Sequence, residues 1–155
     1  MPVTDCLEQA EENSAPSVSA ADEEFLAAFE QCSLPEAQWT HLAHVRVAWI
    51  CLHLALPGEA LSRIRKGILE YNTKVLHRRH KYHDTVTVAF THIVAERMRE
   101  GERWIDFAKR INDFLDPADP ILLRYYSKDR LFSEEARARF IESDLLEIPP
   151  LIRKQ

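Results

Sequence analysis

Apolar residues recur three and four positions apart along most of this chain, which is the spacing of a helix that buries one face. The first such stripe begins with Phe25, Leu26 and Phe29. No segment sustains the alternation of apolar and polar residues that marks a half-buried strand. The pattern therefore predicts an all-α protein, a single-domain irregular bundle of about six helices.

Capping residues and chain breakers set the expected limits of these helices. Ser19 to Asp22 resembles a capping box, Thr40 is a good N-cap, and Asp84 and Thr85 offer caps further along. After a first helix that ends near Cys32, the stripes predict helices over 41–56, 60–75, 85–99, 102–115, 121–126 and 134–142.

The helical stripes lie between two segments of different composition. Residues 1–18 are polar and acidic, and we expect a disordered acidic tail there. Residues 19–150 are expected to form one helical domain, a length sufficient for a hydrophobic core. Pro149 and Pro150 end the helical region, so residues 151–155 are expected to be a short C-terminal tail.

Composition and charge exclude several classes of protein. Only 3 of 155 residues are glycine, which argues against a glycine-rich phosphate loop. The net charge of −5 gives no general attraction to nucleic acid, which we do not expect as a partner. No apolar run reaches the ~20 residues of a membrane span, and three scattered cysteines favour reduced thiols in the cytoplasm.

Histidine is the residue type that points to chemistry. His41 and His44 are three residues apart on one helix, so both rings face the same side, at the mouth of an apolar stripe. His83 opens another predicted helix and could supply a third imidazole. These three residues form a candidate site for a divalent metal, zinc or iron.

Residues beside His83 complete the candidate site. Asp84 is a possible fourth ligand, a residue that orients a ligand, or a helix cap, and Tyr82 and Thr87 are candidates to position substrate or bound water. The leading hypothesis is a metal-dependent enzyme that acts on a small, anionic molecule. The alternatives are a metal-free small-molecule binding or sensing module in the same pocket, and histidines that serve only the structure.

Two further segments combine charge with aromatic residues. Lys74, Arg78, Arg79 and Lys81 form a basic connector, which is either a solvated loop or a region that attracts an anionic substrate, RNA or an acidic partner. Downstream, the segment 122–131 contains Arg124, Tyr125 and Tyr126. These three residues could bind a carboxylate or phosphate, or simply pack.

Three short motifs together resemble a family of small bacterial proteins of uncharacterised function. They are Trp-Thr-His-x-Ala-His-x-Arg-x-Ala-Trp at 39–49, Tyr-His-Asp-Thr-x-Thr at 82–87 and Leu-Leu-x-Tyr-Tyr-Ser-x-x-Arg-Leu at 122–131. The resemblance implies that His41, His44, Arg46, His83, Thr85, Thr87, Tyr125 and Tyr126 belong to the family pattern. It adds Arg46 to the candidate substrate-binding residues. Asp84 stands where that pattern has Glu.

Overall fold

The computed structural model describes residues 17–152, which fold into seven α-helices and four 3₁₀ turns. The helices are α1 (Ala20–Glu30), α2 (His41–Leu54), α3 (Pro57–Lys74), α4 (Asp84–Arg97), α5 (Trp104–Arg110), α6 (Lys128–Leu131) and α7 (Glu134–Ala138). The turns are η1 (Glu36–Gln38), η2 (Arg79–Lys81), η3 (Asn112–Leu115) and η4 (Ile121–Arg124). The predicted all-α fold is confirmed over this range. Most of the acidic tail predicted over 1–18 lies outside the described residues.

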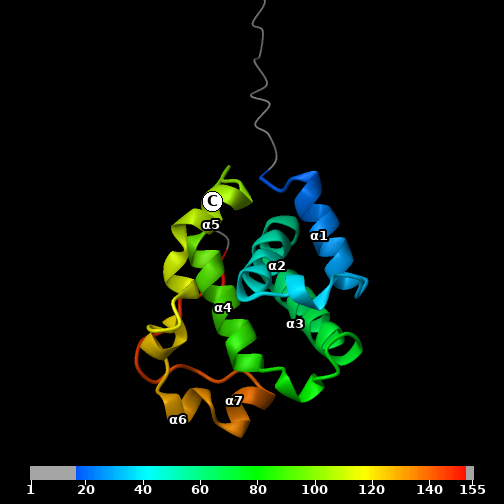
Figure 1. Cartoon of the computed structure of the whole chain (residues 1–155). Coiled ribbons are helices and arrows are strands. Elements are labelled where there is room, and N and C mark those ends of the chain that lie inside the picture. The colour runs from blue at the N-terminus through cyan, green and yellow to red at the C-terminus, as the bar shows by residue number, and fades with distance from the viewer. Residues whose placement is uncertain (1–16, 153–155) are drawn as a thin grey trace, which may run out of the picture.

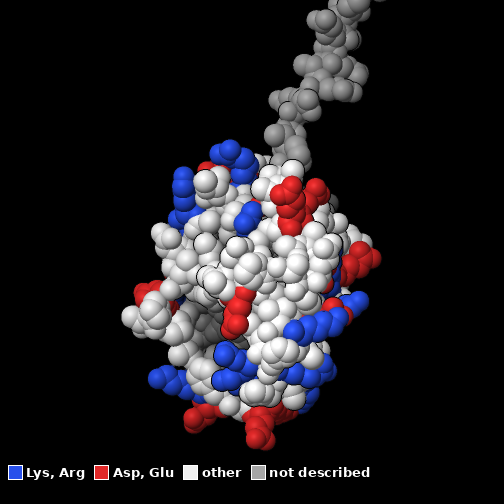
Figure 2. Space-filling view, turned by 45° about the vertical axis from the view of Figure 1, so that its right-hand side comes forward, with Lys and Arg blue, Asp and Glu red and all other residues white. Residues whose placement is uncertain are grey.

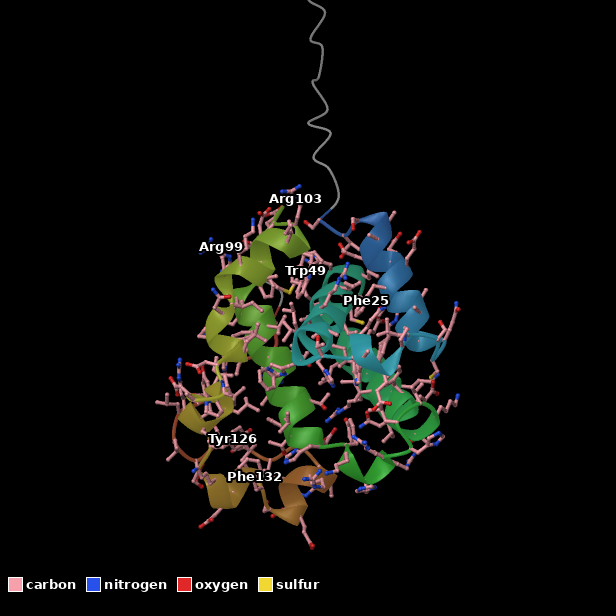
Figure 3. The ribbon with its side chains drawn as sticks, in the orientation of Figure 1. Phe25, Trp49, Arg99, Arg103, Tyr126 and Phe132 are labelled. Carbon is pink, nitrogen blue, oxygen red and sulfur yellow. The ribbon has the colours of Figure 1, made fainter. Side chains whose placement is uncertain are left out.

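Helix α2 is the centre of the bundle and packs against α1, α3, α4 and α5 (Figure 1). Apolar residues occupy nearly its whole circumference, and Val47, Trp49, Ile50 and Cys51 are completely buried. In its second half, Trp49 (labelled in Figure 3) packs against Trp104 of α5, with 5.6 Å between ring centroids. A helix that is apolar on all sides must be covered on all sides, so α2 determines where its neighbours lie. No helix within residues 17–152 is long and apolar enough to cross a bilayer.

The predicted caps of the first two helices are confirmed. Ser19 accepts a hydrogen bond from the Asp22 amide, and the Asp22 carboxylate accepts one from the Ser19 amide, which completes the capping box. The Thr40 hydroxyl accepts a hydrogen bond from the Ala43 amide and begins α2. These interactions join residues three apart, so the local sequence is sufficient to identify them.

The predicted helix limits are wrong at the start of α3, where a local feature decides the backbone, and at the end of α5, where a contact distant in sequence is present. Helix α3 begins at Pro57, at the first helical position, instead of at residue 60. The helix predicted over 102–115 ends at Arg110 and continues as a 3₁₀ turn. There the Asp113 carboxylate accepts two hydrogen bonds from Arg97 of α4, at 3.0 and 2.9 Å.

Residues 121–141, here called the C-terminal arm, contain the remaining differences. The helix predicted over 121–126 is the 3₁₀ turn η4, and the one predicted over 134–142 is the five-residue helix α7. Helix α6, which was not predicted, begins at Ser127, whose hydroxyl accepts a hydrogen bond from the Arg130 amide. The arm crosses the lower end of the bundle, beside the start of α4 (Figure 1).

A glycine allows α1 and α3 to approach closely. Phe29 of α1 is buried and stacks on Trp39, with 4.6 Å between ring centroids, and meets the tilted ring of Tyr71 at 5.6 Å. A Cβ atom added at Gly67 of α3 would lie 2.6 Å from Cε1 of the Phe29 ring. Because that ring is held between two other aromatic rings, it cannot move aside freely.

We expect Gly67→Ala to lower the free energy of unfolding by about 1–2 kcal/mol, because overpacking outweighs the gain in helix propensity. Gly58→Ala is the matched control in the same helix, since a Cβ at Gly58 meets no atom within 4 Å. It should leave stability unchanged or raise it by up to about 1 kcal/mol. Urea denaturation of both variants measures the difference, and equal effects would contradict this account of the packing.

Candidate functional site

His41 and His44 line one small cavity between α2, α3 and α4, with a volume of about 80 Å³. We call it the inner cavity. Its other lining residues are almost all apolar: Val45, Ala48, Ile64, Ile68, Val86, Thr87, Phe90, Thr91 and Val94. His41 is exposed and His44 is half-buried, so the pair stands where the cavity meets the surface. The sequence prediction that both histidines face a common apolar site agrees with this arrangement.

The backbone fixes the protonation of the His44 ring. Nδ1 lies 2.7 Å from the carbonyl oxygen of Thr40 and must carry the proton that it donates there. Burial lowers the pKa of His44 to about 4, against a smaller opposing effect of that hydrogen bond. Near pH 7 the ring is therefore neutral, and its Nε2 is a hydrogen-bond acceptor. The ring also packs against Trp39, with 3.8 Å between centroids.

The other polar side chains of the inner cavity are also acceptors. Nε2 of His41 donates to the Phe114 carbonyl oxygen at 3.0 Å. The Thr87 and Thr91 hydroxyls donate to the carbonyl oxygens of His83 and Thr87, one helical turn back. The cavity thus combines apolar walls with hydrogen-bond acceptors.

A second, larger hollow lies on the other side of His41. This outer groove has a volume of about 410 Å³ and shares His41, Val86 and Phe90 with the inner cavity. The His41 and Phe90 rings meet edge to face at 5.1 Å. Apolar residues line most of the groove, among them Phe114, Leu115, Pro117, Pro120, Leu123 and Phe132. The two spaces are therefore separated by one wall of side chains.

His83 does not join His41 and His44. It is the N-cap of α4, where its Nδ1 accepts a hydrogen bond from the Val86 amide, and its Nε2 donates to the Leu131 carbonyl oxygen at 2.7 Å. With both nitrogens engaged, the ring has no free lone pair for a metal. Within residues 17–152, no group of three or more His, Cys, Asp or Glu side chains is placed to hold a metal ion.

Asp84 is engaged in four hydrogen bonds. Arg65 of α3 donates two of them, at 3.0 and 2.9 Å, and the Tyr82 hydroxyl and the Phe140 amide donate the others. Burial alone would raise the pKa of the Asp84 carboxyl, but these donors together hold it below its usual value of 3.8. Burial and the bond to Asp84 raise the pKa of Tyr82. Both residues are thus engaged with other parts of the fold.

The motif 82–85 holds the C-terminal arm. Beside Asp84, the Thr85 hydroxyl donates to the Arg139 carbonyl oxygen at 2.9 Å and accepts from the Ile141 amide at 3.2 Å. The Tyr126 hydroxyl donates to the Ile141 carbonyl oxygen at 2.7 Å. These contacts draw residues 139–141 into an extended path, which is why α7 ends at Ala138.

The predicted substrate-binding residues lie apart from the inner cavity. Arg46 pairs with Asp22 of α1 at 2.7 Å and packs over the ring of Phe25. Figure 3 labels Phe25. Arg124 pairs with Asp119 at the surface. Tyr126 is buried inside the arm, and Tyr125 is half-buried.

The sequence reasoning missed two residues that the structure makes important. Thr91 lines the inner cavity, and its position one helical turn after Thr87 could have indicated this. Arg65 pairs with Asp84, and no local pattern indicates a contact between residues 19 positions apart. Comparison with protein-family models, curated proteins and solved structures found no match. The resemblance of the three motifs to a bacterial family therefore stays a prediction.

We expect Asp84→Asn to lower the free energy of unfolding at pH 7 by about 2–3 kcal/mol, because it leaves Arg65 and the arm without a charged acceptor. The value is at the lower end for a buried pair because the Arg65 side chain is 39% exposed. The control is Asp106→Asn, whose partner Arg103 is exposed, with an expected loss below about 1 kcal/mol.

The difference between wild type and Asp84→Asn should also depend on pH. A carboxyl whose pKa is lowered by folding stabilises the protein above its unfolded pKa, and this stabilisation is lost as pH falls through the folded pKa. The difference in unfolding free energy between the two proteins, measured by denaturation, should therefore be smaller at pH 3 than at pH 7. An equal gap at both values would contradict the role given to the carboxylate.

The lowered pKa of His44 predicts a second pH effect. Between the ordinary value of 6.5 and the folded value of about 4, the unfolded chain binds a proton that the folded protein does not. Stability should therefore fall as pH drops through this window. His44→Gln, which cannot titrate, should lose less stability between pH 7 and pH 5 than wild type. Parallel losses in thermal or urea denaturation would contradict this prediction.

Proposed function

We propose that this protein is a metal-free binding module for a small, mainly apolar molecule that carries an O–H or N–H group. The observation that carries the proposal is the fixed protonation of His44, which presents an acceptor in an otherwise apolar cavity. A ligand donor that meets Nε2 would gain about 0.5–1.5 kcal/mol relative to a ligand without one.

The same lining argues against an anion in the inner cavity. An anionic group needs donors, whereas the Thr87 and Thr91 hydroxyls already donate their protons to backbone carbonyls. No Lys or Arg lines the cavity. These features favour a neutral ligand over the small, anionic substrate expected from the sequence.

The outer groove supports the proposal by offering room for the apolar part of the ligand. The inner cavity alone accommodates only a few heavy atoms. Rotation of His41, which one hydrogen bond to Phe114 holds, would join the two spaces. The ligand would then place its donor at His44 and its apolar body against Phe90 and the groove.

Three matched probes test this proposal: phenol, toluene and benzoate. We expect phenol to bind in the millimolar range or better, toluene about fivefold more weakly, and benzoate not measurably. Binding is followed by NMR, and the ¹⁵N shift of His44 Nε2 should move with phenol only. Tighter binding of benzoate than of phenol would overturn the proposal.

Two variants locate the probe. His44→Phe keeps a ring beside Trp39 but removes the acceptor, and should reduce phenol binding to the level of toluene. His80→Phe is the matched control, because His80 is exposed and does not line the cavity. Unchanged phenol binding by His44→Phe would show that the acceptor plays no part.

The metal-dependent alternative is tested on the same protein without a histidine tag. His41 and His44 are the pair of imidazoles that could still share an ion, with water or ligand as the other donors. Micromolar binding of Zn²⁺ or Fe²⁺ that is lost in both His41→Phe and His44→Phe would replace the binding module with a metal centre.

We place the protein in the cytoplasm as part of the same proposal. Cys32 and Cys51 are free thiols, and burial raises the pKa of Cys51 to about 12. A buried thiol held in its protonated form is inert, and unpaired cysteines fit a reducing compartment.

A further inference from the structure

The basic connector and α7 together surround an open hollow at the lower end of the bundle. This basic hollow has a volume of about 1040 Å³, and its lining includes Thr73, His77, Arg79, His80 and Arg137. The connector follows α3 in the sequence, whereas Arg137 comes from the C-terminal arm. Figure 2 shows Lys and Arg side chains gathered over the lower part of this face.

Arg79 and Arg137, which line the hollow, and their basic neighbours in the connector form no ion pair, whereas most of the other arginines among residues 17–152 do, Arg99 and Arg130 excepted. Arg46, Arg63, Arg65, Arg97, Arg103, Arg110, Arg124 and Arg139 each form an ion pair. Within residues 17–152, the ion pairs of the structure include none for Lys74, Arg78, Arg79, Lys81 or Arg137. These cations are thus held without a direct ion pair in a protein of net charge −5, although Glu134 also lines the hollow.

Two of these arginines donate hydrogen bonds to uncharged acceptors, which hold their side chains in place and leave their charge unpaired. One Nη atom of Arg137 donates to the carbonyl oxygens of His80 and Lys81, at 3.4 and 3.2 Å. One Nη atom of Arg79 donates to the Thr73 hydroxyl at 3.4 Å. Both guanidinium groups are therefore tethered at the hollow with their charge and most of their donors available.

The backbone of the connector is strained at His77. Its φ of 52° lies in the left-handed region, which glycine adopts readily and residues with a Cβ atom adopt at an energetic cost. The turn is held by the Arg78 amide, which donates to the Asn72 carbonyl oxygen at 2.8 Å. The exposed ring of His77 lines the hollow from this turn.

We propose that the basic hollow binds a compact polyphosphate group, such as inorganic tripolyphosphate or the triphosphate of a nucleotide. Guanidinium groups match phosphate oxygens in geometry and charge, and several clustered cations favour a ligand with several negative charges. An extended nucleic acid fits less well, because it needs a long run of basic contacts along its backbone, whereas the protein as a whole is acidic.

Calorimetry with tripolyphosphate at about 50 mM salt tests the proposal on the full chain. We expect a dissociation constant below about 100 μM, weakened about tenfold when salt rises to about 200 mM. Arg79→Ala and Arg137→Ala should each weaken binding about tenfold. Arg79→Lys should weaken it about threefold, because lysine keeps the charge but cannot donate two parallel hydrogen bonds to a phosphate. The control is Arg103→Ala, because Arg103 is exposed at the start of α5 and does not line the hollow; this change should alter affinity less than twofold.

A second variant separates binding from folding. His77→Gly relieves the strained backbone, so it should keep or raise the melting temperature while it weakens tripolyphosphate binding. Unchanged affinity in the Arg79→Ala, Arg137→Ala double variant would overturn the proposal, as would no binding at 1 mM tripolyphosphate. Tighter binding of a ten-nucleotide single-stranded RNA than of tripolyphosphate would assign the surface to nucleic acid instead.

Discussion

The carboxylate of Asp84 joins three stretches of chain that are distant in sequence. It accepts hydrogen bonds from Arg65 in α3, from Tyr82 before α4, and from the Phe140 amide in the C-terminal arm. Each acceptor position of a buried carboxylate must be filled, since an unmet charge in the interior is costly. This requirement ties the start of α4 to α3 on one side and to the arm on the other.

The inner cavity depends indirectly on the same interaction. Val86, Thr87, Phe90 and Thr91 line it from α4, and the position of α4 relative to α3 is fixed where Arg65 meets Asp84. The arm also closes one side of the outer groove with Leu123 and Phe132. A pair of residues that lines neither space thus helps to hold the helices that shape both.

Features within four residues of each other could be predicted from the sequence. The capping box at Ser19, the N-cap at Thr40 and the shared face of His41 and His44 all depend on helix geometry alone. The prediction of a third imidazole at His83 did not account for its use as an N-cap, or for its contact with Leu131, 48 positions away. The end of the helix predicted over 134–142 was wrong for the same reason, because Thr85 and Asp84 bind residues 139–141 and α7 ends at Ala138.

The separation of Asp84 from its partner Phe140 has a consequence for how the protein is made. The two residues are 56 positions apart, so at roughly 5–20 residues per second the ribosome delivers the second roughly 3–11 s after the first. During that interval Thr85 and Asp84 lack their contacts with the arm, and Leu122 and Leu131 do not yet cover the core. During synthesis, the start of α4 therefore exposes polar groups and core surface that the arm later covers, which is where a chaperone would bind the nascent chain.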